Sequence, residues 1–256
     1  MVDDWVIRVG RLVFRLLGLR VRLEGLEHVP RTGPAVLAAN HVSFLDFLLL
    51  GLVGEEQCGR RVRFLARHDL WKVRPVGRLM DRMGHVPVDR DAPADAYLRA
   101  REALRRGELV GIFPEAGVSR SFTVRALMPG AAALANETGA PLVPVVLWGG
   151  QRIWTAKSRP VLRRHVPVSV SVGPRLPEAG VVERTALLGR TLQGMLDGVQ
   201  AEPRHRPAPG ESPAWHPHHL GGSALSVAEA ALVQDVPRSA LDPAWAPAVR
   251  AAAAEG

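Results

Sequence analysis

The chain has 256 residues, 47% of them hydrophobic, and a formal net charge of +8. This length fits one α/β domain, or one domain with a small appendage, and provides enough apolar residues for a sizeable core. The positive charge indicates an anionic partner such as nucleic acid, acidic lipid or a phosphorylated substrate. Aromatic residues make up only 5% of the sequence, which disfavours single-stranded nucleic acid because its binding proteins stack bases on aromatic platforms. The single cysteine, Cys58, excludes an internal disulfide and fits a reducing compartment.

The predicted elements begin with an N-terminal helix over residues 1–20. Its apolar residues fall on one side, and Arg8, Arg11 and Arg15 share a flank because they are spaced by three and four. This pattern is typical of a helix that lies in a membrane interface. We therefore predict an anionic membrane surface as a partner and the cytoplasmic face of the cell membrane as the location. The alternative is an ordinary amphipathic helix packed on the domain. The arginines interrupt any run of about 18 apolar residues, so no transmembrane helix is predicted.

Strands and helices then alternate through residues 21–201. The apolar pattern predicts strands within 21–30, 35–40, 61–67, 85–88, 108–115, 141–149 and 166–173, the last of them half-exposed. Helices or helical turns are expected within 44–53, 71–84, 93–106, 129–139 and 181–200, with Gly139 as the end of the fourth. This alternation predicts an α/β fold, in which a single domain has a mostly parallel, largely buried sheet flanked by helices.

The composition changes near residue 202. Residues 202–256 are rich in proline and alanine, and we expect a loosely packed C-terminal extension rather than a second folded domain. His216, His218 and His219 fall within this extension. They are compatible with a metal site or with a tail that folds over the functional face of the domain. The absence of cysteine or carboxylate partners nearby disfavours the metal, and we predict none.

A histidine and an aspartate follow the strand at 35–40 at short spacing. Ser43 and Asp46 have the S-x-x-D form of a capping box, in which each side chain binds the other's backbone N–H, and this explains both residues structurally. It does not explain His41. A neutral imidazole just before a helix N-terminus, with one nitrogen held by a carboxylate, is a general base. We therefore predict that the chain folds back to bring Asp46 to the ring of His41.

Two further stretches place polar residues after strands. In "GHVPVDRD", residues 84–91, Arg90 is suited to bind a phosphate through its guanidinium fork; the alternative is an edge strand that ends in a solvated charge cluster. In "GIFPEAGVSRSF", residues 111–122, Glu115 is suited to bind a substrate hydroxyl or to orient a basic neighbour, and Arg120 offers a second phosphate contact. Backbone amides of this loop are candidates to stabilise an oxyanion; the alternative is a polar turn.

In this order the three stretches resemble the motifs of the glycerolipid acyltransferase family, of the lysophosphatidic acid acyltransferase type. The first family motif, Asn-His-x-x-x-x-Asp, is matched by Asn40, His41 and Asp46. The second, Gly-x-x-Phe-Ile-x-Arg, is matched at Gly84 and Arg90, although Pro and Val stand where Phe and Ile are usual.

The third family motif is Phe-Pro-Glu-Gly-Thr-Arg-Ser. Residues 113–115 match its beginning, and residues 119–121 resemble its end after a segment that is longer by two residues. A fourth motif, an apolar strand with a central proline, is similar to "PLVPVVLW", where the proline is Pro144. The resemblance extends over roughly residues 25–175.

The resemblance implies an acyltransferase that acts on 1-acylglycerol 3-phosphate and gives phosphatidate. His41 would deprotonate the acceptor hydroxyl and Asp46 would orient His41, while the hydroxyl attacks the thioester of acyl-CoA or acyl-carrier protein. The partners implied are that donor and a lysophospholipid acceptor, with no nucleic acid, metal or organic cofactor. The resemblance also implies a substrate-binding set, which comprises Asn40, Ser43, Gly84, Arg90, Glu115, Gly117, Ser119 and Arg120.

Two alternatives remain open. The same chemistry could act on another acceptor, such as glycerol 3-phosphate, another lysolipid or a lipid-linked sugar. The chain could also be a non-catalytic basic protein that binds anionic membranes or nucleic acid, in which case binding would depend strongly on salt without turnover.

Overall fold

The computed structural model describes residues 12, 14–15, 18–67, 78, 86–88, 93–161, 163–233 and 243–247. Most of the predicted N-terminal helix and of the helical turns within 71–84 lies outside these residues, as do Gly84 and Arg90. Within the described part, no helix is both long and apolar enough to span a membrane.

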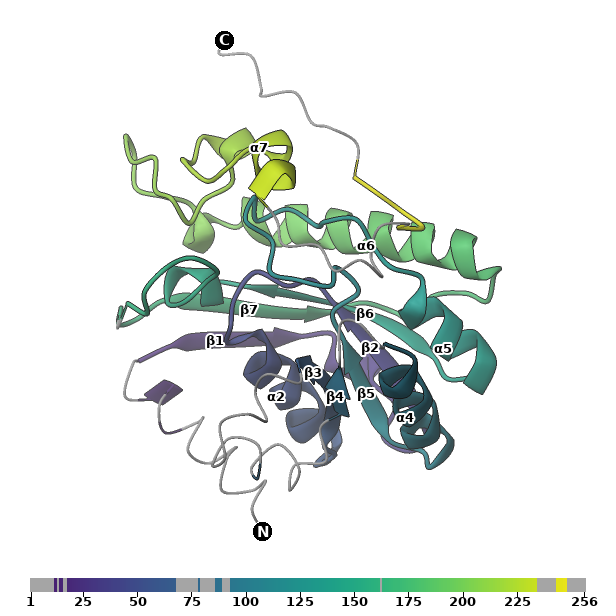
Figure 1. Ribbon diagram of the computed structural model, residues 1–256. Helices are drawn as coiled ribbons and strands as arrows, with labels where there is room; N and C mark the ends of the chain where they lie inside the picture. Colours follow the sequence, from purple (N-terminus) through teal and green to yellow (C-terminus); the bar gives the residue numbers. More distant parts are fainter. Residues whose placement is uncertain are drawn as a thin grey trace.

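A seven-stranded sheet forms the centre of the domain (Figure 1), in the order β1-β7-β6-β2-β5-β3-β4. Every neighbouring pair is parallel except β6 and β7, which are antiparallel. The prediction of a mostly parallel, largely buried sheet in a single α/β domain is confirmed. The strands are β1 (Arg20–Glu24), β2 (Ala35–Ala39), β3 (Val62–Arg67), β4 (Val86–Val88), β5 (Leu109–Ile112), β6 (Leu142–Trp148) and β7 (Pro167–Val172).

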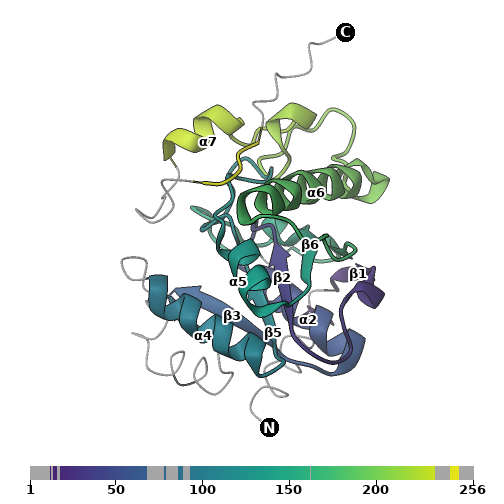
Figure 2. The ribbon, with the colours of Figure 1, turned by 90° about the vertical axis from the view of Figure 1, so that its right-hand side faces the viewer.

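Helices cover both faces of this sheet (Figures 1 and 2). The α-helices are α2 (Asp46–Cys58), α4 (Pro93–Arg105), α5 (Gly130–Thr138), α6 (Val181–Ala201) and α7 (Val227–Val233). Short 3-10 helices are η1 (Leu26–His28), η3 (Gly150–Arg152), η4 (Pro203–His205) and η5 (His218–Leu220). The predicted end of α5 at Gly139 is confirmed, because this residue is the C-cap with φ 67°.

The central strand β2 contributes to two hydrophobic cores because successive side chains of a strand point to opposite faces. Val36 and Ala38 belong to the core shared with α4, α5 and α6. Ala35, Leu37 and Ala39 belong to the core shared with α2. All five are buried, so the end of β2 is held firmly at the middle of the sheet.

Two expectations about packing were wrong. The alternation within 166–173 predicted a half-exposed strand, yet β7 is buried at four of its six positions because β1 and β6 pair with its two edges and α6 packs on it. The C-terminal extension was expected to be loosely packed, but His205, His216 and Ala230 are buried. The ring of Trp245 packs on the core at Gly189 of α6.

The extension is also joined to the loop that follows β5. The backbone N–H of Leu127 donates to the carbonyl of Trp245 (2.8 Å), and the N–H of Ala244 donates to the carbonyl of Leu127 (3.0 Å). The ring of Trp215 lies under the guanidinium of Arg152, 3.8 Å from its central carbon. These contacts attach the described part of the extension to the domain.

Candidate active site

Asn40 fixes the point at which the chain leaves the sheet. Its side-chain Nδ2 donates to the carbonyl of Leu147 (3.1 Å), and its Oδ1 accepts from the N–H of Leu147 (2.7 Å). Both amide atoms are thus engaged with β6, and the side chain is completely buried. Asn40 was predicted to bind substrate, but it is buried and both of its amide atoms bind β6. Its role is to position His41 at the carboxyl end of β2.

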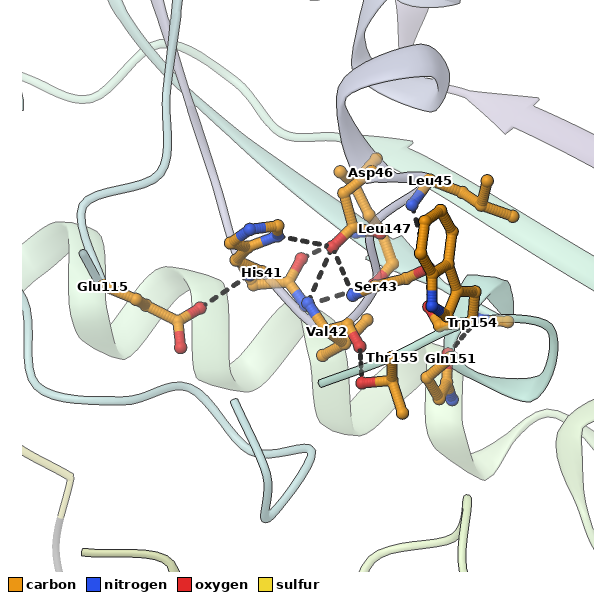
Figure 3. Close-up of polar contacts among 12 residues, drawn as sticks. His41, Val42, Ser43, Leu45, Asp46, Glu115, Leu147, Gln151, Trp154 and Thr155 are labelled. Atoms are coloured by element: carbon orange, nitrogen blue, oxygen red, sulfur yellow. Dashed lines mark hydrogen bonds and ion pairs between the residues drawn. The ribbon is translucent and has the colours of Figure 1, made fainter. Parts of the chain in front are cut away.

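Asp46, the first residue of α2, gathers three donors on a single oxygen (Figure 3). Its Oδ2 accepts from the N–H of Val42 (2.7 Å), the N–H of Ser43 (2.8 Å) and Nδ1 of His41 (2.9 Å). The predicted fold-back of the chain is confirmed. Burial raises the pKa of the Asp46 carboxyl above its ordinary value, and these donors oppose the rise because they stabilise the carboxylate.

Only half of the predicted capping box forms. Asp46 accepts from the N–H of Ser43 as expected, but the Ser43 hydroxyl accepts from the nearer N–H of Leu45 (3.0 Å) and donates to the carbonyl of Trp154 (2.7 Å). The N-cap of α2 is Leu45, which has no side-chain cap. Ser43 is completely buried, so it anchors the loop instead of contacting substrate as predicted.

The imidazole of His41 is held on two sides. Its Nδ1 points to Asp46, and its ring stacks on Phe113 with 4.3 Å between ring centroids. The side chain is 19% exposed, and the part of the chain that the structure describes offers no hydrogen bond to Nε2. When Asp46 is ionised, Nδ1 must donate the proton, which leaves the Nε2 lone pair to accept one. This arrangement is suited to general-base catalysis.

Glu115 supports His41 from the opposite side to Asp46 (Figure 3). Its Oε1 accepts from the backbone N–H of His41 (2.8 Å), and its Oε2 accepts from the backbone N–H of Arg125 (2.9 Å). Burial raises the pKa of Glu115 to about 8, against the effect of these two donors and of the Arg125 charge. The predicted contact with a substrate hydroxyl does not fit, because both carboxylate oxygens are buried and already accept backbone hydrogen bonds. The structure fits the alternative prediction, in which Glu115 orients a basic neighbour.

The loop after Glu115 is folded onto the backbone of His41. Ser119 donates its N–H to the carbonyl of His41 (2.7 Å) and its hydroxyl to the carbonyl of Thr123 (2.7 Å). Ser119 is completely buried, so it does not contact substrate as predicted. It binds the backbone of His41 at the end of β2 instead. Ala116 takes a left-handed conformation with φ 53°, at the position where the family motif has glycine. Gly117 is half-buried in the same loop.

Two arginines follow Glu115 with different surroundings. Arg120 is half-buried next to Ser119, and the described residues supply it with no hydrogen bond or ion pair. Its guanidinium therefore remains suited to bind a phosphate. Arg125 is only 8% exposed, and its charge acts on Glu115. Nothing in the sequence pattern distinguished Arg125, because the contact depends on the path of the loop.

Of the second motif, residues 84–91, the structure describes only residues 86–88. β4 lies beside β3 in parallel register and ends two residues before Arg90. The carboxyl ends of β2, β3, β4 and β5 share one edge of the sheet because these strands are parallel. Gly84 and Arg90 themselves lie outside the described residues, so their roles stay predictions.

Residues after β6, which the sequence analysis did not single out, complete the support of the dyad. The carbonyl of Trp154 accepts from the Ser43 hydroxyl and from the N–H of Phe44 (3.2 Å). The Thr155 hydroxyl donates to the carbonyl of Val42 (2.7 Å). A Cβ on Gly150 would lie 2.9 Å from the Ser43 side chain. The sequence did contain one sign of this contact: two glycines, Gly149 and Gly150, directly follow a buried strand, where a close approach of another segment is expected.

The part of the chain that the structure describes offers no cluster of three or more His, Cys, Asp or Glu side chains able to hold a metal ion. The chemical groups assembled at the end of β2 are a His–Asp dyad, a buried glutamate and a half-buried arginine. They are suited to remove a proton from a hydroxyl beside an anionic group.

Comparison with known proteins identifies the family of the chain. A family model described as Acyltransferase matches residues 20–148. The chain is 33% identical over 148 residues to the chloroplastic 1-acyl-sn-glycerol-3-phosphate acyltransferase LPAT1 of Arabidopsis thaliana, covering 56% of this chain and 40% of that protein. It is 30% identical over 187 residues to the human 1-acyl-sn-glycerol-3-phosphate acyltransferase alpha, covering 71% and 64%.

A bacterial relative and a solved structure extend this comparison. The 1-acyl-sn-glycerol-3-phosphate acyltransferase of Bacillus subtilis is 31% identical over 137 residues, covering 52% of this chain and 66% of that protein. The chain thus spans between 40% and 66% of the length of these three relatives. The crystal structure of the 1-acyl-sn-glycerophosphate acyltransferase PlsC from Thermotoga maritima has the same fold, with a TM-score of 0.66 at 21% identity and coverage of 78% and 80%.

The family model covers half of the chain, and its match begins at β1 and ends with β6. It therefore includes both residues of the dyad, Glu115 and Arg120. On this ground the chain belongs to the acyltransferase family.

Proposed function

We propose that the chain transfers an acyl group from acyl-CoA or acyl-carrier protein to the free hydroxyl of 1-acylglycerol 3-phosphate, giving phosphatidate. The observation that carries the proposal is the His41–Asp46 pair, in which Nδ1 is bound at 2.9 Å and Nε2 is left to accept a proton. The named activity of the three curated relatives supports the choice of acceptor.

In the proposed reaction, Nε2 of His41 takes the proton of the acceptor hydroxyl as its oxygen attacks the thioester carbonyl. The carbon–oxygen bond forms, and the tetrahedral intermediate then breaks its carbon–sulfur bond. The leaving thiolate takes the proton from the imidazolium, which gives a free thiol and restores neutral His41. The carboxylate of Asp46 stabilises the imidazolium in between, because it lies next to Nδ1.

The acceptor phosphate would bind to cationic side chains at the same edge of the sheet. Arg120 supports this assignment because the residue is half-buried and its guanidinium has no partner among the described residues. Arg90 is the second candidate, since β4 ends shortly before it. No further cofactor is required in this scheme, because the thioester supplies the leaving group.

We place the reaction at the cytoplasmic face of the cell membrane, where the acceptor lipid resides. The net charge of +8 favours an anionic surface. The arginine-flanked apolar sequence at residues 1–20 is consistent with peripheral binding.

The test is thiol release from palmitoyl-CoA in the presence of lysophosphatidic acid, glycerol 3-phosphate or another lysolipid. The proposal predicts release that depends on the acceptor and is fastest with lysophosphatidic acid. Faster release with a different acceptor would keep the chemistry and change the substrate. Release that is independent of every acceptor would indicate a thioesterase and contradict the proposal.

A further inference from the structure

The chain between η3 and β7 concentrates positive charge beside the candidate active site. We call residues 154–165 the basic loop; residue 162 within it lies outside the described residues. The sequence has no Asp or Glu between Glu137 and Glu178. The basic loop contains four exposed cationic side chains for which the described residues form no ion pair, namely Lys157, Arg159, Arg163 and Arg164.

Exposed apolar side chains lie among these charges. Trp154 is 38% exposed and Val161 is 56% exposed. Phe44, which precedes α2, is also 38% exposed, and its ring lies 4.9 Å from the ring of Trp154. Cationic side chains that surround exposed aromatic and aliphatic groups match a lipid interface, where the charges meet headgroups and the apolar groups enter below them.

Hydrogen bonds join the start of the basic loop to the chain that holds the dyad. Trp154 and Thr155 bind the backbone and side chains of residues 42–44 (Figure 3). The N–H of Val161 donates to the carbonyl of Ile153 (2.8 Å), a buried residue that directly precedes the loop. A surface that binds this loop would therefore lie at a fixed position relative to His41.

The N-terminal segment enters the fold at the same place. The N–H of Arg20 donates to the carbonyl of Val166 (3.2 Å), directly after the basic loop. A Cβ on Gly18 would lie 2.8 Å from Nδ1 of His165, so the two segments are in contact. Phe14 is buried in the core, whereas Leu12 is 53% exposed. The segment predicted to bind the membrane thus ends beside the loop.

We propose that the basic loop is a second docking element, which binds an anionic membrane surface together with the N-terminal segment. This inference rests on the membrane association in the proposed function, and it assigns part of that association to residues outside the predicted N-terminal helix. An acidic carrier protein is the competing partner for the four cations. The exposed Trp154 and Val161 favour the membrane, because its interface accepts apolar side chains next to charged ones.

The first test compares two charge variants of the full chain by co-sedimentation with phosphatidylcholine vesicles that contain phosphatidylserine. One variant is Lys157→Ser, Arg159→Ser, Arg163→Ser and Arg164→Ser. The matched control removes four exposed arginines from other surfaces: Arg31→Ser, Arg99→Ser, Arg175→Ser and Arg190→Ser. We expect the loop variant to lose at least about tenfold in vesicle partitioning, and the control to lose much less. If both variants lost the same amount of vesicle partitioning, the effect would depend only on net charge, and the proposal would be overturned.

The second test removes apolar surface without changing charge. Val161→Ser should weaken vesicle partitioning by severalfold, whereas Val182→Ser, which alters a 65% exposed valine on α6, should leave it unchanged. No effect of Val161→Ser would contradict insertion of the loop into the interface.

A third measurement separates this inference from the proposed function. Thiol release is measured with monodisperse short-chain donor and acceptor, so that no membrane is needed, and the loop variant should keep the wild-type rate. A raised KM for the carrier-protein donor with unchanged vesicle binding would assign the loop to the donor and overturn the proposal. If the wild type binds vesicles through the loop but shows no turnover with any acceptor, the docking inference stands and the proposed function fails.

Discussion

His41 and His205 are both hydrogen-bonded through one ring nitrogen, yet their surroundings differ in every respect that matters for catalysis. His41 is partly exposed and bound to the carboxylate of Asp46. His205, in η4, is 1% exposed and its Nε2 lies 2.7 Å from the hydroxyl of Ser169, which is also buried. Burial lowers the pKa of His205 to about 3, and the charges of Arg204 and Arg152 add to this effect.

The comparison shows that a serine–histidine contact does not make a nucleophile. Ser169 cannot be reached by a substrate because it is buried in β7. Among the described residues, no carboxylate stabilises the charged form of His205, and its Nδ1 has no hydrogen-bond partner there. Exposure of the ring and a carboxylate on its far nitrogen therefore distinguish the catalytic histidine from the structural one. The following predictions test this distinction, beginning with the largest expected effect.

Replacing the two histidines should separate activity from stability. His41→Ala removes the base and should lower the rate of acyl transfer by about 10³-fold. The fall in melting temperature should be modest, because the backbone N–H groups of Val42 and Ser43 still bind Asp46. His205→Ala is the control: it should lower the melting temperature and leave the rate close to that of the wild type. Thiol release and thermal unfolding are measured on both. If folded His205→Ala lost turnover, His205 would take part in catalysis, and the distinction between a catalytic and a structural histidine would be wrong.

Asp46→Asn should remove the charge and preserve the geometry. All three donors bind Oδ2, while Oδ1 has no partner among the described residues, so an asparagine oxygen can take the same three bonds. We expect kcat to fall by about 10²-fold because the imidazolium loses its counter-charge. Circular dichroism should show the wild-type fold. An unchanged kcat would mean that the carboxylate only shapes the loop.

His205→Asn should change the pH dependence of stability on the acid side. A folded-state pKa near 3, below the ordinary 6.5, means that the folded protein favours neutral His205. Its contribution to stability is present above pH 6.5 and is lost as the pH falls towards 3, by at most about 1.4 kcal/mol per pH unit. The variant, which cannot titrate, should have a flatter free energy of unfolding in this range. The same slope in both proteins would contradict the assignment.

Glu115→Gln should have the opposite effect on the alkaline side. Because the folded-state pKa is raised to about 8 from 4.5, the contribution of Glu115 is present below pH 4.5 and is lost as the pH rises through 8. Urea unfolding of the wild type should show stability falling over this interval, and the variant should lose that slope. The same slope in both proteins would indicate that Glu115 is ionised in the folded protein over this interval and would contradict the prediction.

The smallest effect is expected at Ala116. Its left-handed conformation disfavours a side chain, so Ala116→Gly should raise the free energy of unfolding, by at most about 1 kcal/mol. The control is Ala100→Gly near the middle of α4, which should lower it by about the same amount. Destabilisation by both changes would show that Ala116 is not strained.

Much of this structure was predictable because its signals are local. The buried strands are short apolar runs bounded by Gly or Pro. His41 and Asp46 are only five residues apart, so their contact could be predicted from this short spacing together with the chemistry of a general base. The role of Glu115 was only half predicted, because its partner His41 is 74 residues away. Asn40 and Ser43 were assigned to substrate because a motif names residue types and does not reveal which of them are buried.

Other features depend on how distant segments pack. The extension was expected to be loose because its Pro-rich composition hides the contacts of Trp245 and His205 with the core. The basic loop was overlooked because a charged loop alone does not indicate a function. Its position next to the dyad depends on the contact between Trp154 and Ser43, which the sequence does not reveal. β7 was expected to be half-exposed because alternation alone does not show that α6 covers it.

The central claim is that His41 activates the hydroxyl of a lysophospholipid for acyl transfer. The most direct measurement is mass spectrometry of the lipid product formed from palmitoyl-CoA and 1-acylglycerol 3-phosphate by the wild type and by His41→Ala. The account predicts phosphatidate with one added palmitoyl ester from the wild type, and about 10³-fold less from the variant in the same time. Phosphatidate formed by the variant at the wild-type rate would contradict the account.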